Sequence, residues 1–230
     1  MALLFVPNPH PYRPHLPSWR QPLYLHLRPL WLALQRTLAS CEGRVLDIGC
    51  GLQPYRQFLN ASRTEYVGLD REGPLSQPTV VGSAEDLPFD DQSFDVVIST
   101  QVLEHVQEPR VALHEAVRVL RPGGRLLLTV PGVWPTHEAP HDYWRFTRHG
   151  LLHLLETEGI ACGELMALGG LWATAGQMVN LALYRNALLR ELVPAVNLTC
   201  EALDRLPMRD DLVLNWLADG IRSPAPALVG

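Results

Sequence analysis

The sequence predicts a doubly wound α/β protein in which seven strands form a mainly parallel sheet. Short apolar runs alternate with stretches of helical periodicity, and the first of these runs ends in a glycine-rich turn. The chain has 230 residues, of which 47% are hydrophobic and 19% charged. That composition is typical of a globular protein with one sizeable core.

The first elements are an arm and a helix. Residues 1–22 are rich in proline, which predicts an extended arm. From residue 23 to residue 39 the apolar residues return at helical spacing, with Pro29 as a kink or a start point. We therefore treat residues 1–40 as an N-terminal arm and helix, and residues 41–230 as the main domain.

Strands and helices then alternate. The apolar runs predict five strands at residues 44–48, 65–69, 79–81, 95–99 and 125–130. Residues 109–120 have helical spacing, and the RPGG segment at 121–124 is a typical helix end. A loop rich in Pro, His and Trp follows at residues 131–146, then a helix at 147–158 and a sixth strand at 160–168. The last strand is expected within residues 212–222.

Residues 169–206 predict a helical insertion before the last strand. No charge occurs between Glu164 and Arg185, so the length alone would allow a membrane span. Gln177 and Asn180 would be unpaired in lipid, which argues against a span. We expect instead an amphipathic helix at 171–189 that covers a substrate pocket or meets a second subunit of a homodimer, with peripheral membrane contact as an alternative. Its predicted buried face comprises Leu171, Ala175, Met178, Val179, Ala182 and Leu189.

Charge and cysteine content exclude several classes. The net charge is −5, and all 19 basic residues are Arg. A chain without Lys cannot form a Schiff base with pyridoxal phosphate and lacks the Lys of P-loop proteins and protein kinases. Without clustered positive charge, nucleic acid is not expected as a partner. The four Cys are widely spaced and the N-terminus lacks a signal-peptide pattern, so we expect a cytoplasmic protein. The bias toward Arg, Leu, Ala and Pro indicates a GC-rich bacterial genome.

The glycine-rich turn predicts a ligand site. Asp47 stands at the end of the first strand, with Gly49 and Gly51 in the turn, and Asp70 ends the second strand. Ligands bind outside the carboxyl ends of such strands, where a carboxylate can accept hydrogen bonds from ribose hydroxyls. Asp47 suits a cationic group better than a pyrophosphate, and Pro54 replaces the third glycine of a dinucleotide fingerprint. This chemistry favours S-adenosylmethionine.

The sequence resembles the class I S-adenosylmethionine-dependent methyltransferases, in the branch called type 11. Four stretches occur in the family's order and spacing: VLDIGCG (45–51), GLD (68–70), GSAEDLPFDDQSFDVVISTQVLEHV (82–106) and RVLRPGGRLLLTVP (118–131). The resemblance covers residues 44–131. It implies a Rossmann-like fold of seven strands that binds S-adenosylmethionine and transfers its methyl group.

The resemblance also implies which residues bind the cofactor. The set comprises Asp47, Gly49, Cys50 and Gly51 near the methionine end, Asp70 and Arg71 near the ribose, Ser83, Ala84 and Glu85 near the adenine, and Thr100 and Gln101 beside the methionine portion. This sequence departs from the family at Ser83, where Asp is common, and at Gln53, where Gly is common. We expect binding to be retained.

The loop HEAPHDYWRFT (137–147) is the expected substrate side. His137 or His141 is a candidate general base, with Asp142 to orient it. The alternative is that His141, Asp142 and Arg145 only fasten the loop. The string HEAPH matches a zinc-protease motif, but Pro140 opposes the helix which that motif requires, so no metal is predicted. The resemblance implies that Glu104 and His105 open a short helix near the site, where we expect them to cap or pack.

The expected function is S-adenosylmethionine-dependent methyl transfer to a small-molecule or glycan/lipid-linked acceptor. Two alternatives remain at this stage. One is a non-catalytic module that binds S-adenosylmethionine, and the other is an NAD(P)-dependent oxidoreductase, which Pro54 and Asp47 disfavour.

Overall fold

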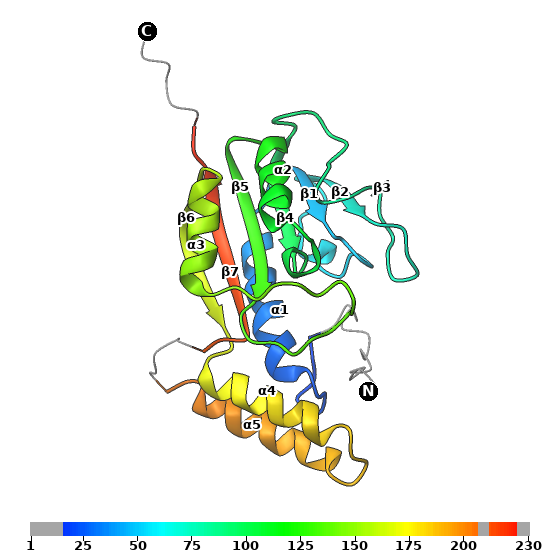
Figure 1. Ribbon diagram of the computed structural model, residues 1–230, viewed down its shortest axis with the longest axis vertical. Coiled ribbons are helices and arrows are strands. Elements are labelled where there is room, and N and C mark those ends of the chain that lie inside the picture. Colours follow the sequence, from blue (N-terminus) through cyan, green and yellow to red (C-terminus); the bar gives the residue numbers. More distant parts are fainter. Residues whose placement is uncertain (1–15, 207–211, 225–230) are drawn as a thin grey trace.

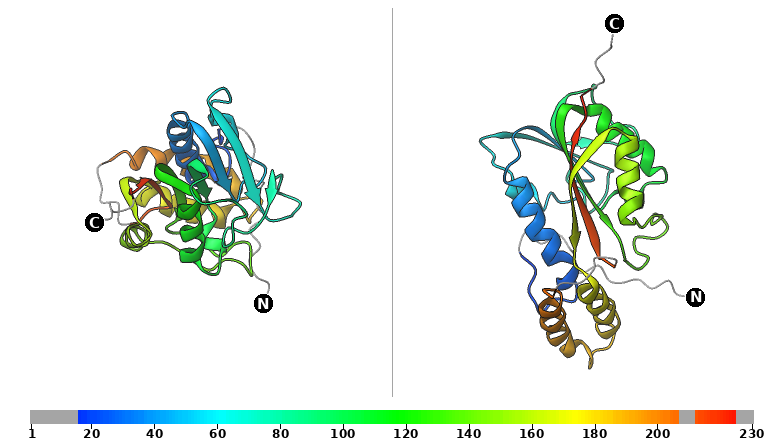
Figure 2. Two further views of the ribbon diagram at one scale, coloured as in Figure 1. Left: turned by 90° about the horizontal axis from the view of Figure 1, so that it is seen from above. Right: turned by 90° about the vertical axis from the view of Figure 1, so that its left-hand side faces the viewer.

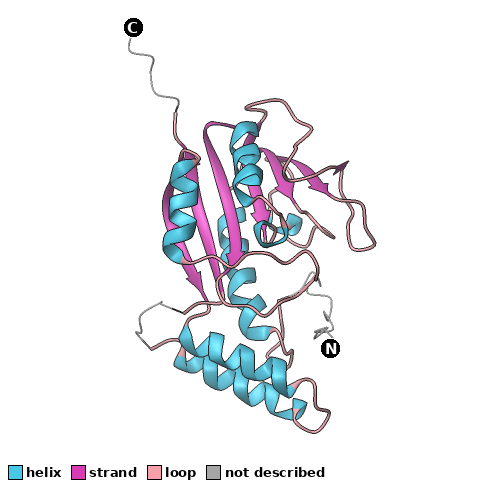
Figure 3. Cartoon of the chain, viewed as in Figure 1, coloured by secondary structure: helices cyan, strands magenta, loops and turns pink. Residues whose placement is uncertain are grey.

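The computed structural model describes residues 16–206 and 212–224, in which seven strands form a single sheet (Figures 1 and 3). The strands are β1 (Gly43–Ile48), β2 (Thr64–Asp70), β3 (Val80–Val81), β4 (Phe94–Thr100), β5 (Leu120–Pro131), β6 (Ile160–Leu168) and β7 (Asn215–Arg222). Their order is β3-β2-β1-β4-β5-β7-β6, and β7 runs antiparallel to both neighbours. The predicted seven-stranded, mainly parallel sheet is confirmed. Most of the predicted arm lies outside the described residues.

Helices cover both faces of the sheet (Figure 2). Helix α1 (Tyr24–Leu38) packs on one face, and α2 (Pro109–Val119) and α3 (Arg148–Thr157) pack on the other. Successive strand residues point to opposite faces. Val97 of β4 accordingly belongs to the core beneath α2, whereas Val96 and Ile98 belong to the core beneath α1. The sheet is therefore doubly wound.

Two local predictions need correction. Pro29 lies inside α1 and does not start it, because the helix begins at Tyr24. The RPGG segment does end α2, at Val119, but it is not a loop. Strand β5 begins directly at Leu120 and includes the segment, and Leu120 itself is fully buried beside Phe94 of β4.

The predicted helical insertion at 169–206 forms two helices and not one. Helix α4 (Leu171–Leu183) and helix α5 (Val193–Leu203) pack against each other, joined by a bend that contains a short 3-10 helix, η3 (Arg190–Leu192). This hairpin extends beyond the sheet at the end where β4 and β5 finish (Figure 1). No helix among the described residues combines the length and apolar character needed to cross a bilayer.

Most of the predicted buried face of α4 is wrong, although Met178 does pack against a buried cluster. The helix buries Ala173, Thr174, Gly176, Gln177 and Asn180, whereas Val179 is 47% exposed and Leu189 lies beyond the helix end. The buried amides have partners in the chain. Gln177 Nε2 donates to Pro22 O at 2.9 Å, and Asn180 Nδ2 donates to Asn197 Oδ1 at 2.7 Å.

Asn197 of α5 connects this hairpin to the segment before α1. Its Nδ2 donates to Trp19 O at 2.8 Å and to Gln21 O at 2.9 Å, and the side chain is fully buried. A helical hairpin that turned its apolar residues inward would have no partner for those two carbonyls. Hydrogen bonding, and not apolar periodicity, therefore sets which face is buried.

We predict that Asn197→Ala destabilises the protein by about 2–4 kcal/mol, because it leaves the fully buried Asn180 amide without its acceptor and removes the donor to the Trp19 and Gln21 carbonyls. Urea unfolding at neutral pH measures the change. Leu198→Ala is the matched control on the same helix, since Leu198 is 50% exposed, and we expect it to stay within about 0.5 kcal/mol of the parent. Equal losses in the two variants would contradict this assignment.

Candidate functional site

The turn after β1 depends on backbone conformations that favour glycine. Gly49 has φ +69° and Gly51 has φ +52°. A Cβ on Gly49 would lie 2.4 Å from Val102 Cγ2, so this position also requires the absence of a side chain. Gln53 has φ 56° as well, in the left-handed region that favours glycine. The turn brings backbone N–H groups to the carboxyl end of the sheet.

Two carboxylates flank this turn. Asp70 Oδ2 accepts a hydrogen bond from Gly51 N at 2.8 Å, and Oδ1 accepts one from Arg71 N at 2.7 Å. Asp47 is 5% exposed, and its Oδ2 accepts from the Tyr66 hydroxyl at 2.7 Å. Burial raises the pKa of Asp47 to about 7, against the opposing effect of the Tyr66 hydrogen bond. Such a pair suits a ligand with hydroxyl and ammonium groups and disfavours a pyrophosphate.

The remaining predicted cofactor residues lie on the neighbouring strands and loops. Glu85 Oε1 accepts from Glu108 N at 3.1 Å, and its Oε2 lies 3.7 Å from Arg71. Ser83 Oγ accepts from Glu85 N at 3.2 Å, so the hydroxyl holds its own turn. Ala84 packs against the core beneath α2. These contacts place the predicted ribose and adenine residues side by side.

At the end of β4, Gln101 has φ 56° and is held by Thr129 of β5. Its backbone N donates to Thr129 O at 3.0 Å and its Nε2 to Thr129 Oγ1 at 3.2 Å. Thr100 Oγ1 is buried with no hydrogen-bond partner among the described residues. Cys50 turns inward, and burial raises the pKa of its thiol to about 12, so its side chain packs while its backbone belongs to the turn.

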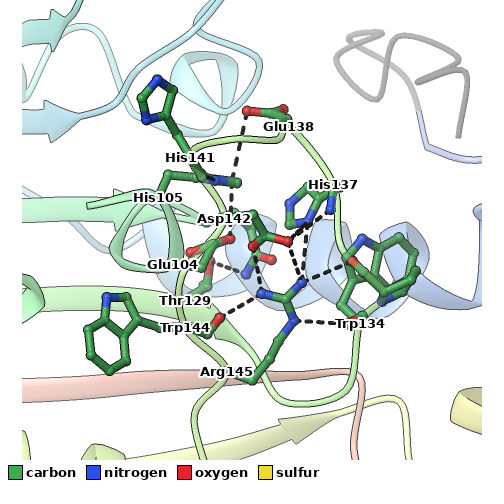
Figure 4. A network of polar contacts seen from close by, with 12 residues as sticks. Glu104, His105, Thr129, Trp134, His137, Glu138, His141, Asp142, Trp144 and Arg145 are labelled. Atoms are coloured by element: carbon green, nitrogen blue, oxygen red, sulfur yellow. Dashed lines mark hydrogen bonds and ion pairs between the residues drawn. The ribbon is translucent and has the colours of Figure 1, made fainter. Parts of the chain in front are cut away.

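The loop after β5 is organised by one arginine (Figure 4). Arg145 forms a two-pronged ion pair with Asp142, with N–O distances of 2.7 and 2.8 Å. The same guanidinium donates to Trp134 O and Pro135 O, each at 2.9 Å. Burial acts to raise the pKa of Asp142, but the hydrogen bonds from Arg145 and from the His137 backbone outweigh it and lower the pKa to about 2. The loop therefore contains a fixed anion.

Asp142 orients His137 and not His141. Asp142 Oδ2 accepts from His137 N at 2.8 Å and lies 3.3 Å from His137 Nδ1. The His141 ring is exposed, and its Nδ1 lies 3.0 Å from the Tyr143 hydroxyl. Residues 137–141 form no helix, which removes the context that a zinc-protease motif needs. Of the three predicted catalytic residues, the fold brings together His137 and Asp142.

Glu104 and His105 enter the same site from the segment after β4, η2 (Leu103–His105). Glu104 O accepts from Tyr143 N at 2.8 Å, which fixes the loop to the sheet. His105 Nδ1 lies 2.6 Å from His141 O, so this ring nitrogen donates and Nε2 is left facing Glu104 Oε1 at 3.8 Å. The His105 and His137 rings contact edge to face with centroids 4.7 Å apart. The expectation that Glu104 and His105 cap or pack did not include their contact with His137. Their position directly after a parallel strand is the sequence signal that places them at this edge of the sheet.

Burial is the largest cause of the pKa shifts of Glu104 and His137. The Glu104 side chain is fully buried, and both carboxylate oxygens lack a hydrogen-bond partner among the described residues. Burial raises the pKa of Glu104 to about 8. Burial also lowers the pKa of His137, and the neighbouring His105 adds to that effect. At neutral pH His137 is therefore unprotonated and able to accept a proton or bind a cation.

A stacked pair joins the loop to α1. The Trp134 and His26 rings lie 4.1 Å apart at 27°, and His26 Nδ1 is 3.0 Å from Asn215 Nδ2. Complete burial lowers the pKa of His26 to about 3. The folded protein thus holds His26 neutral, whereas the unfolded chain protonates it below about pH 6.5.

Comparison with known proteins finds similarity to methyltransferases. Residues 46–128 match the family model described as a methyltransferase domain. The chain is 39% identical over 113 residues to a demethylmenaquinone methyltransferase of Clavibacter sepedonicus, covering 43% of this chain and 46% of that protein. It is 33% identical over 151 residues to a probable S-adenosylmethionine-dependent methyltransferase of Mycolicibacterium smegmatis, covering 58% of each. The chain spans about half the length of these relatives.

Solved structures agree on the fold. An S-adenosylmethionine-dependent methyltransferase from Mesorhizobium loti superposes with a TM-score of 0.55 at 17% identity, over 86% of this chain and all of that chain. At this level of identity the similarity concerns the fold alone. The shared fold places the glycine turn and the loop after β5 at one edge of the sheet.

We predict that His26 makes the protein less stable in mild acid. A pKa lowered by folding stabilises the protein fully above about pH 6.5, and this contribution is lost as the pH falls toward 3. Between pH 7 and pH 5 the loss is about 2 kcal/mol for one proton. His26→Phe keeps an aromatic ring against Trp134 and should lose correspondingly less over that interval in urea unfolding. His153→Phe, at an exposed position of α3, should follow the parent, and identical pH slopes in all three proteins would refute the assignment.

Proposed function

We propose that this chain, whose residues 46–128 match a methyltransferase domain, transfers the sulfonium methyl group of S-adenosylmethionine to a small-molecule or glycan/lipid-linked acceptor. The observation that supports this most directly is the position of the glycine turn and of the loop after β5 at the same edge of the sheet. The glycine turn follows β1, its two carboxylates lie at the ends of β1 and β2, and the loop with His137 (Figure 4) follows β5, so all of these stand at the carboxyl edge of the parallel strands. A donor on the turn would therefore face an acceptor at the loop.

The residues at the turn fit the donor. The Asp70 carboxylate, already fixed by two backbone N–H groups, has further lone pairs for the ribose hydroxyls. Asp47 supplies negative charge for the methionine ammonium, and binding that cation favours its ionised form. The side chains of Arg71 and Glu85 border the region assigned to the ribose and adenine. The sulfonium supplies the electrophilic methyl group, so the chain's part is to align donor and acceptor.

His137 is the histidine we assign to the acceptor, in preference to His141. Its Nδ1 faces Asp142 and Arg145, so Nε2 is the ring nitrogen left to act on an acceptor proton. Such help matters for an acceptor that must lose a proton, such as a hydroxyl, and much less for a neutral amine. The Asp142–His137 pair therefore favours a hydroxyl acceptor.

The helical hairpin supports a lipid-linked acceptor and peripheral membrane contact. Its bend carries Leu188, which is 86% exposed, and Leu192, which is 51% exposed, and Leu198 on α5 is half exposed. The hairpin extends from the same end of the sheet as the loop (Figure 1). Exposed apolar residues gathered at one end of a protein suit contact with an apolar surface. A homodimer through the same face is the alternative, and retention of the parent by vesicles in flotation separates the two.

A non-catalytic binding module is the rival function. It would bind the donor and its product with the same residues but transfer no methyl group. The Asp142–His137 pair and the buried Glu104 favour catalysis, because a module that only binds the donor has no need for titratable groups on the acceptor side.

We predict that Asp70→Ala weakens S-adenosylhomocysteine binding by at least about tenfold, because hydrogen bonds to a charged acceptor contribute about 1.5–3 kcal/mol each. Asp70→Asn keeps one acceptor for Gly51 N, so it separates loss of the ribose contact from collapse of the turn. Glu72→Ala, at an exposed position two residues further on, is the matched control. Calorimetry in which Asp70→Ala binds as tightly as the parent would place the cofactor elsewhere.

We predict that His137→Ala lowers turnover by about 10²–10⁴-fold with S-adenosylhomocysteine affinity unchanged, because the histidine acts on the acceptor and not on the donor. His141→Ala, which removes an exposed ring from the same loop, should lower turnover much less. Turnover is measured as conversion of S-adenosylmethionine in the presence of hydroxyl-bearing acceptors. A loss confined to His141→Ala would reverse the assignment.

A further inference from the structure

We propose that Glu104, His105 and His137 form a binding site for a divalent transition-metal ion between the segment after β4 and the loop after β5. Each residue offers one ligand atom, and these three atoms lie within 4.8 Å of one another. Two ligands on one zinc-class ion, each at about 2.1 Å, stand no more than about 4.2 Å apart. Movement of less than about 1 Å therefore closes the set around an ion.

The buried carboxylate of Glu104 is the independent sign of a missing partner. Its side chain is fully buried, both oxygens lack hydrogen bonds among the described residues, and Oε1 faces His105 Nε2 at 3.8 Å. A buried carboxylate without a partner is costly in either protonation state, since the charged form is desolvated and the neutral form has a hydroxyl with no acceptor. A bound cation would satisfy both oxygens and the ring nitrogens together.

The two histidines are oriented as metal ligands commonly are. His105 donates Nδ1–H to the His141 carbonyl, and His137 presents Nδ1 to the Asp142 carboxylate. In each ring this contact fixes which nitrogen is left for the cluster, as carbonyl and carboxylate partners do behind metal-bound imidazoles. Binding a water molecule between these residues would not require two imidazole rings with fixed orientations.

The donor set indicates the class of ion. Two imidazoles and one carboxylate favour Zn²⁺, Mn²⁺ or Fe²⁺ over Mg²⁺, which prefers an all-oxygen set. Three protein ligands leave coordination positions open. Glu138 Oε2, which lies 3.9 Å from His105 Nε2, is near enough to occupy one of them. An acceptor hydroxyl could occupy another.

This inference deepens the proposed function. A hydroxyl bound to the ion would have a lower pKa and release its proton to solvent more readily. Its oxygen would then attack the sulfonium methyl group, so that an O–C bond forms as the S–C bond breaks and S-adenosylhomocysteine leaves. His137 would then affect the acceptor as a ligand of the ion, and Asp142 would hold the His137 ring in place. The location beside the acceptor rests on the proposed methyl transfer, but metal binding by the three residues does not.

The test is calorimetric titration of the untagged full chain, stripped with a chelator, using ZnCl₂ and MnCl₂ in separate runs without methyl donor. We expect one equivalent to bind, and Glu104→Gln and His105→Ala each to weaken binding by about 100-fold or more. His114→Ala is the matched control, because His114 is an exposed histidine that pairs with Glu158 outside the site. S-adenosylhomocysteine binding by Glu104→Gln confirms that this variant is folded.

Two results would overturn the metal site. One is the absence of binding by the stripped parent at micromolar concentrations of either metal, and the other is unchanged binding in Glu104→Gln and His105→Ala. Either result leaves the methyl-transfer proposal standing, because S-adenosylhomocysteine binding and methyl transfer are measured separately. If metal binds as expected but the chain transfers no methyl group, the proposed function fails and the site remains.

Discussion

The ion pair between Arg145 and Asp142 organises the loop after β5, which lies at the carboxyl edge of the sheet. Strands end at the carboxyl edge of the sheet, and the chain beyond β5 has no ladder to satisfy its backbone groups. One guanidinium supplies donors to two loop carbonyls and to the Asp142 carboxylate, which in turn accepts from the His137 backbone. The loop is thereby fixed without regular secondary structure, and the His137 ring is fixed with it.

The loop is fastened to the rest of the protein at two further points. On the sheet side, the backbone carbonyl of Glu104 accepts from Tyr143 N, and Trp144 Nε1 donates to Val106 O at 2.9 Å. On the other side, Trp134 stacks on His26 of α1. These contacts come from elements remote in sequence, so the geometry of the acceptor side requires the whole domain to be folded. Contacts of this kind preorganise a site before any ligand arrives.

The C-terminal hairpin of α4 and α5 buries different kinds of side chains from the sheet. The sheet and its helices pack through apolar residues that alternate or recur with the expected period. The hairpin instead buries amides and small residues of α4, while Leu188, Leu192 and Leu198 remain exposed. A protein that only needed stability would turn those leucines inward. The arrangement leaves these leucines exposed at the end of the sheet where the loop after β5 lies, at the cost of burying amides, of which Asn180 Oδ1 has no hydrogen-bond partner among the described residues.

The sequence by itself determined the strands, the glycine turn and the two carboxylates beside it. These features depend on local properties: alternating side chains for a strand, the left-handed backbone for Gly49 and Gly51, and an aspartate at a strand end. The tertiary structure alone decided which histidine meets Asp142, that Glu104 and His105 reach His137, and which face of α4 is buried. Hydrophobic periodicity cannot reveal these outcomes, because they depend on hydrogen-bond partners such as the Trp19 and Gln21 carbonyls, which belong to distant segments. Local sequence shows which groups need partners, and only the fold determines which partners they meet.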